Sequence, residues 1–101
     1  MVQNKKVGTT PQQLYKSDAQ NVLTTIVFTD TAEEEDFVSL NIVQAGTSVT
    51  NTSLVLNELP LAGKESYVLN LEKFVLDLSD SIWAKCKNGT VVTTYSIMSM
   101  T

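Results

Sequence analysis

The amino-acid sequence predicts an all-β protein, an antiparallel β-sandwich or jelly roll of about seven to eight short strands. Runs rich in Val, Ile, Thr and Phe alternate apolar with polar residues, which is the period of a half-buried strand. Turn signals separate these runs at roughly eight- to twelve-residue spacing, and no run has the period of an amphipathic helix. Because a single flat sheet would leave one apolar face uncovered, two packed sheets are expected.

The first thirteen residues are predicted to form an extended N-terminal arm. They are polar, contain Gly8 and Pro11 and show no sustained periodicity. Two interpretations are open, a disordered leader or a tether that orders against a neighbouring subunit. A single sandwich domain is expected over residues 14–101, with the apolar pair Leu14 and Tyr15 anchoring the arm on a sheet edge.

Two strands with an acidic loop between them are expected next, at residues 22–29 and 37–44. Val22, Thr24, Ile26 and Phe28 share one face of the first run, and the second alternates in the same way. We expect the two strands to pair. The acidic run at residues 33–36 is interpreted as a solvated loop rather than a Ca²⁺ site, because consecutive carboxylates do not easily converge on one ion.

The middle of the chain predicts further strands around a connection. A strand is expected within residues 48–57, and residues 59–64 are expected to connect it to the next. Pro60 has no N–H for a strand ladder, and Gly63 permits a tight reversal. A strand at residues 67–71 follows, and residues 74–78 are expected to lead to Asp80 and the last hairpin.

The clearest pattern predicts a β-hairpin over residues 74–100. Asn88-Gly89 is the dipeptide best suited to a type I′ turn, in which both residues need a positive φ. Such a turn would place Cys86 opposite Val91, Ala84 opposite Thr93 and Ile82 opposite Tyr95, on the core side of one sheet together with Ile97.

The other side of this hairpin carries unusually apolar residues for a solvent-facing strand. Trp83, Lys85, Val92 and Met98 would lie there. Trp and Met are enriched at protein interfaces, so we interpret these four, with Leu14 and Tyr15, as candidate interface residues. The alternative for Trp83 is packing under a loop or the arm of the same chain.

Composition argues against several classes of partner. The chain has 101 residues, no His, no Arg, seven Lys and eleven acidic residues, for a formal charge of −4. A nucleic-acid surface needs clustered basic residues, so nucleic acid is not expected as a partner. No run approaches the ~20 apolar residues of a membrane span, and the single Cys86 cannot form an intrachain disulfide. No metal or other cofactor is expected.

An enzyme is not expected either. The chain has no His for general base catalysis, its only thiol lies on the predicted core side, and no Ser has the context of a nucleophile elbow. Asp77 and Asp80 are the remaining carboxylate pair, but they flank the start of a strand, where Asp is ordinary in turns.

An ordered series of turns and strands resembles the small β-sandwich proteins of tailed-bacteriophage virions. The matching features span about residues 14–98: Leu14-Tyr15, the strand from Leu23 to Phe28, the linker from Leu59 to Gly63, the strand from Val68 to Leu71, and Leu76 followed by Asp80-Ser81-Ile82. One feature departs from the family pattern, because Asn51-Thr52-Ser53 comes after the 38–43 run rather than at the end of an earlier strand.

The resemblance implies a non-enzymatic structural protein located in the virion and assembled in the host cytoplasm. Members of this family are accessory proteins of the capsid, neck, tail or fibre, including decoration or cement proteins, often as homo-oligomers. The implied partners are copies of the chain itself and a major capsid or tail protein. The alternative function class is a tail- or neck-fibre module that binds a carbohydrate or receptor on the host surface.

Overall fold

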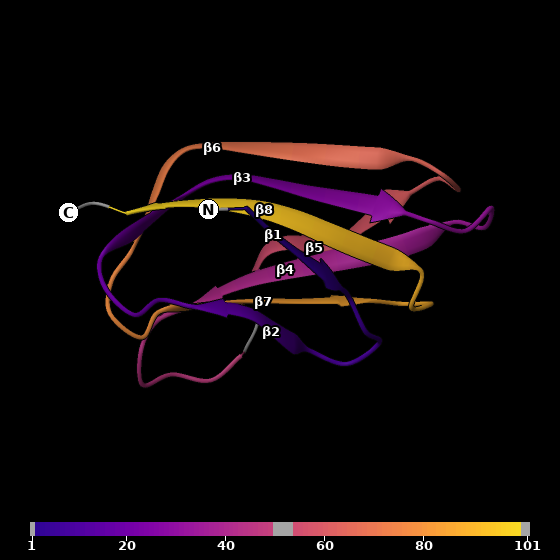
Figure 1. Cartoon of the computed structure of the whole chain (residues 1–101). Coiled ribbons are helices and arrows are strands. Elements are labelled where there is room, and N and C mark those ends of the chain that lie inside the picture. Colours follow the sequence, from indigo (N-terminus) through magenta and orange to yellow (C-terminus); the bar gives the residue numbers. More distant parts are fainter. Residues whose placement is uncertain (1, 50–53, 100–101) are drawn as a thin grey trace.

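A computed structural model describes residues 2–49 and 54–99, which form a two-layer β-sandwich of eight strands (Figure 1). The fold class predicted from the sequence is therefore confirmed. The strands are β1 (Val2–Lys6), β2 (Gln12–Lys16), β3 (Asn21–Asp30), β4 (Asp36–Val43), β5 (Leu54–Leu61), β6 (Ser66–Leu76), β7 (Ser81–Cys86) and β8 (Val91–Ser99).

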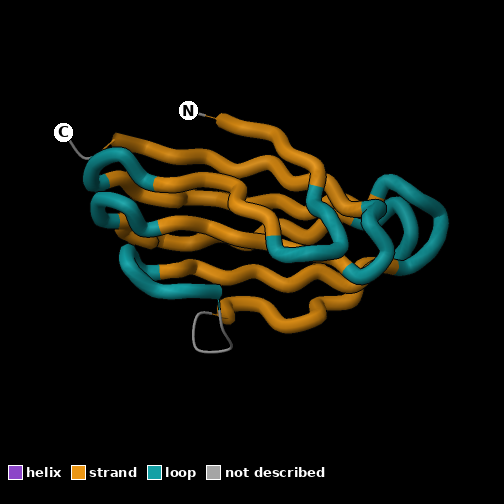
Figure 2. The backbone as a smooth tube through the Cα atoms, turned by 90° about the horizontal axis from the view of Figure 1, so that it is seen from below, coloured by secondary structure: helices purple, strands orange, loops and turns teal. Residues whose placement is uncertain are grey.

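The strand order is that of a jelly roll. Sheet A has the order β1-β8-β3-β6 and sheet B the order β2-β7-β4-β5, and every neighbouring pair is antiparallel. Strand β1 pairs with β8, β2 with β7, β3 with β6 and β4 with β5, so the chain is one long folded hairpin wrapped into two layers. The connections gather at the two ends of the strands (Figure 2).

The predicted hairpin at Asn88-Gly89 is wrong. Strands β7 and β8 lie in opposite sheets, so residues 87–90 cross from one layer to the other. Gly89 has a φ of 76°, but Asn88 is not among the residues with positive φ, as a type I′ turn would require. The carboxylate of Asp36 accepts hydrogen bonds from the backbone N–H of Asn88 and of Thr90, and this holds the crossing segment in place.

The predicted pairing of the two strands around the acidic loop is also wrong. Strand β3 pairs with β6 and β8 in sheet A, whereas β4 pairs with β5 and β7 in sheet B. The acidic loop therefore connects the two layers. Its start is tied to neighbouring connections, because Thr31 N–H donates to the carbonyl of Thr90 and Lys64 N–H donates to that of Ala32.

The N-terminal segment is part of the sandwich and not a separate arm. Strand β1 pairs with residues 92–96 of β8 and forms an edge of sheet A. Backbone pairing continues past β1 toward both sheets, because Val7 N–H donates to Val91 O of β8 and Cys86 N–H, from β7, donates to Gly8 O. Val7 is fully buried, so this segment supplies core as well as backbone pairing. The sandwich therefore includes strands from residues 2–13, which we expected to precede it.

The middle of the chain forms two long edge strands. Residues 59–61, expected in a connection, belong to β5, and Pro60 is tolerated there because β5 is an edge of sheet B. Residues 67–71 and 74–76 form one strand, β6, with a register shift opposite Thr24 in place of the expected break. Asn51-Thr52-Ser53 lies outside the described residues.

The predicted core stripe is confirmed although its pairing is not. Ile82, Ala84 and Cys86 point into the sandwich from sheet B, and Val91, Tyr95 and Ile97 point into it from sheet A. They therefore meet across the layers rather than side by side. The buried cluster also includes Val7, Leu14, Leu23, Ile26, Phe28, Val38, Leu40, Leu61 and Leu76.

Candidate interaction surfaces

The six candidate interface residues lie in different parts of the molecule. Trp83 and Lys85 are on the outer face of sheet B, and Val92 and Met98 are on the outer face of sheet A. Leu14 is 1% exposed and belongs to the core. Because β7 and β8 are in opposite layers, a single interface made from all six residues is excluded.

The outer face of sheet A has no charged side chain on its two central strands. Residues in phase with the core point inward, so the intervening residues of β8 and β3 form this face. Val68, on the neighbouring strand β6, is 52% exposed, and Met98 is 57% exposed. We call this surface the uncharged face; it comprises Val92, Thr94, Ser96 and Met98 of β8, Thr25, Val27 and Thr29 of β3, and Val68 of β6.

A hollow of about 700 Å³ lies between the end of β2 and the end of β8, and it brings together two of the predicted residues, Tyr15 and Met98. The Tyr15 hydroxyl accepts a hydrogen bond from Asn21 Nδ2 at 2.8 Å, and its ring lies 6.0 Å from that of Tyr95. The Tyr15 side chain thus already makes contacts within its own chain.

The outer face of sheet B carries Trp83 beside the connection between β4 and β5. The indole N–H of Trp83 donates to Ser81 Oγ at 2.8 Å. A groove of about 380 Å³ runs between this indole and residues 44–49. The expectation that a loop of the same chain packs near Trp83 therefore agrees with the structure, but the indole remains only half-buried and lines a groove.

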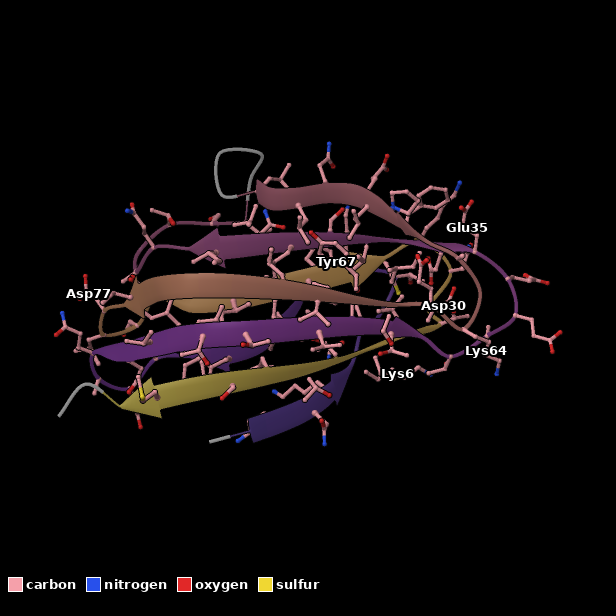
Figure 3. All side chains as sticks on the ribbon, turned by 90° about the horizontal axis from the view of Figure 1, so that it is seen from above. Lys6, Asp30, Glu35, Lys64, Tyr67 and Asp77 are labelled. Atoms are coloured by element: carbon pink, nitrogen blue, oxygen red, sulfur yellow. The ribbon has the colours of Figure 1, made fainter. Side chains whose placement is uncertain are left out.

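Two buried carboxylates hold the opposite end of the sandwich together, and sequence reasoning missed both. Asp30 and Asp36 are each 0% exposed, and Thr90 Oγ1 lies 2.9 Å from an oxygen of each. Figure 3 shows Asp30 at this end with Lys64 and Glu35. The alternation of β3 could have predicted that Asp30 is buried, since Asp30 is in phase with buried Ile26 and Phe28.

Asp36 stays ionised in this buried position because four hydrogen bonds reach its carboxylate. Its burial alone would raise the pKa, but the N–H groups of Thr90, Asn88 and Phe37 and the Thr90 hydroxyl outweigh that effect and lower the pKa from 3.8 to about 2. The Asp36 carboxylate, at the start of β4, is thus a structural anchor between the two layers.

The carboxylate pair considered for catalysis has a structural role in the connection between β6 and β7. Asp80 accepts from Asp77 N–H and from Ala45 N–H, each at 2.9 Å, and Asp77 accepts from Gln20 Nε2. Among the residues that the structure describes, no three Asp, Glu or Cys side chains come together as metal ligands, and Glu33–Glu35 are exposed around the buried Asp36.

Cys86 lies in the core, as the alternation predicts. It is 2% exposed, and its thiol donates to the carbonyl of Val7. Burial raises the pKa of the Cys86 thiol, so little of the reactive thiolate is present at neutral pH.

In the described part of the chain, no helix is long and apolar enough to cross a membrane. No family model, curated protein or solved structure matches this chain. The resemblance to phage virion proteins therefore depends on the sequence features described above.

Proposed function

We propose that this protein is a non-enzymatic structural component of a tailed-bacteriophage particle. It would be an accessory or decoration protein that packs on copies of itself and on a major capsid or tail protein. The resemblance of residues 14–98 to such proteins supports this, and the jelly roll is an architecture common among viral capsid domains.

The observation that carries the proposal is the uncharged face of sheet A. The cores of protein interfaces are depleted of charged residues, whereas solvent-facing strands usually carry them. Strands β3 and β8 present none on this face, and Val68 and Met98 are more than half exposed there. On this face β3 and β8 carry only Thr and Ser as polar residues, and the nearest charge among the described side chains is Lys6 on the edge strand β1, opposite Val92. An assembly surface accounts for the exposed apolar side chains of such a face.

The opposite face is less suited to assembly. Lys85 lies on the outer side of β7, and Lys87 Nζ lies 5.3 Å from the centre of the Phe37 ring. A host-binding fibre module, which is the second function class from the sequence, would use this face, where Trp83 lies.

The test is a mass measurement in solution, by sedimentation and light scattering, on the protein alone and mixed with purified tailed-phage capsids. We expect self-association or capsid binding that Val68→Lys weakens at least about tenfold, because a desolvated Lys at an interface has no partner. Val55→Lys is the matched control, since Val55 is 39% exposed on sheet B. A strict monomer that binds no capsid, or equal effects of the two variants, would contradict the proposal.

A further inference from the structure

The groove beside Trp83 combines an aromatic ring with amide and hydroxyl groups. It lies on the outer side of sheet B, where residues 44–49, which follow β4, extend below β7 in Figure 1. We call it the Trp83 groove; its main side chains are those of Gln13, Lys16, Gln44, Ser48, Ser81 and Trp83. Its volume of about 380 Å³ is within the range of small-molecule sites.

The indole of Trp83 is held in a fixed orientation. Its N–H donates to Ser81 Oγ on the same strand, two residues away. Gln13 is its partner on the adjacent strand β2, so the Gln13 amide and the indole are direct neighbours on one face. Because the indole N–H already donates to Ser81, the indole can contact a ligand only through the apolar face of its ring.

The opposite wall of the groove is fixed by a tight turn. Thr47 donates to the carbonyl of Gln44 through both its N–H, at 3.1 Å, and its Oγ1, at 2.7 Å. Gly46 has a φ of 80°, which suits glycine, and Ala45 N–H donates to Asp80 Oδ1. Because these contacts already fix this wall, ligand binding would cost little conformational entropy there.

The groups in the groove match a neutral, polyhydroxylated ligand. The amides of Gln13 and Gln44 each offer donors and an acceptor, and hydroxyl groups add both. The lining has one charged side chain, Lys16, and no carboxylate. A single Lys on a chain of charge −4 is a poor site for a polyphosphate, whereas a sugar ring can place its C–H face on an indole and its hydroxyls on amides.

We propose that the Trp83 groove binds a neutral oligosaccharide, with the ring of Trp83 as the stacking platform and the Gln13 and Gln44 amides as hydrogen-bonding partners. The sequence alone offers few planar hydrogen-bonding groups for a sugar, and the fold supplies them by bringing β2 and the β4–β5 connection beside Trp83. The site is on the layer opposite the uncharged face and does not depend on the assembly proposal.

The experiment uses the intrinsic fluorescence of Trp83, the only Trp in the chain. The intact protein is titrated with maltotriose, cellotriose and tri-N-acetylchitotriose. We expect a saturable change in emission with at least one trisaccharide, with a dissociation constant in the millimolar range or below. If no trisaccharide gives a saturable change, the proposal is wrong.

Variants then locate the binding site. Gln13→Ala keeps the fluorophore and should weaken binding of that trisaccharide about tenfold, which corresponds to one lost hydrogen bond of about 1.4 kcal/mol. Gln12→Ala is the matched control, because Gln12 is the neighbouring exposed residue of β2 and does not line the groove, and it should bind as the wild type does. Trp83→Ala, followed by calorimetry, should abolish binding. Unchanged affinity in Gln13→Ala would overturn the assignment, even if Trp83→Ala fails to fold.

Discussion

Replacing Asp36 by Asn should destabilise the protein by about 3 kcal/mol at neutral pH. The carboxylate accepts from Phe37 N–H at 2.7 Å and Asn88 N–H at 2.8 Å on one oxygen, and from Thr90 N–H at 3.0 Å and its hydroxyl on the other. An Asn side chain can keep one set of acceptor bonds but turns its NH₂ toward the second set. A buried N–H without an acceptor costs about 1–3 kcal/mol, and the remaining bonds lose their charge assistance.

The same contact predicts how stability depends on pH. The pKa of Asp36 is lower in the folded protein, at about 2, than its ordinary value of 3.8. Its contribution, about 2 kcal/mol, is therefore fully present above the ordinary pKa and is lost as the pH falls through the folded pKa. The difference in stability between wild type and Asp36→Asn should narrow by about 1 kcal/mol between pH 7 and pH 3.

Urea unfolding followed by Trp83 fluorescence measures both effects, with midpoints compared at pH 7 and pH 3. Glu35→Gln is the matched control, because it removes the same charge from the adjacent residue, whose side chain is exposed. It should change the free energy of unfolding by less than about 0.5 kcal/mol. The reasoning is refuted if Asp36→Asn behaves like this control, or if its deficit is the same at both pH values.

Three further predictions test the packing. Gly63→Ala should prevent stable folding in a thermal melt, because a Cβ there would collide with the backbone of Glu33. Gly46→Ala, with φ 80° and open space, should cost only about 1 kcal/mol, and equal effects would contradict this reasoning. Leu14→Ala should lower the free energy of unfolding by about 2–5 kcal/mol without a specific effect on assembly, and a change in assembly alone would restore Leu14 as an interface residue. Cys86 should react with a thiol reagent only when the protein unfolds, so rapid labelling of the native protein would show that the thiol is accessible.

The positions of most strands and the identity of the core residues could be predicted because alternation is a local property. Ile82, Ala84 and Cys86 point inward whichever strand lies beside them, so the buried stripe does not depend on the pairing. The same local rule indicated that Cys86 is unreactive.

The pairing of strands could not be predicted, because contacts from distant residues decide it. Asn88-Gly89 has the composition of a tight hairpin turn, but the Asp36 carboxylate takes up the N–H groups of Asn88 and Thr90. Gly63 is a second example. The sequence predicted that Gly63 allows a tight reversal of the chain, but the residue with a positive φ is Lys64. Glycine is required at position 63 because the backbone of Glu33 lies too close for a Cβ. The Trp83 groove depends in turn on a connection whose place beside Trp83 follows from the sheet order.

The wrapped strand order has a consequence for how the protein forms during synthesis. Strand β1 completes its ladder only with residues 92–96, and β2 pairs with residues 81–84. The ribosome therefore releases the first two strands long before their partners exist. Until β7 and β8 emerge, β3 and β4 also lack a neighbour on one side. Folding with such distant pairing is slow, so the nascent chain exposes unpaired strand edges for most of its synthesis, and this is the interval in which aggregation competes with folding.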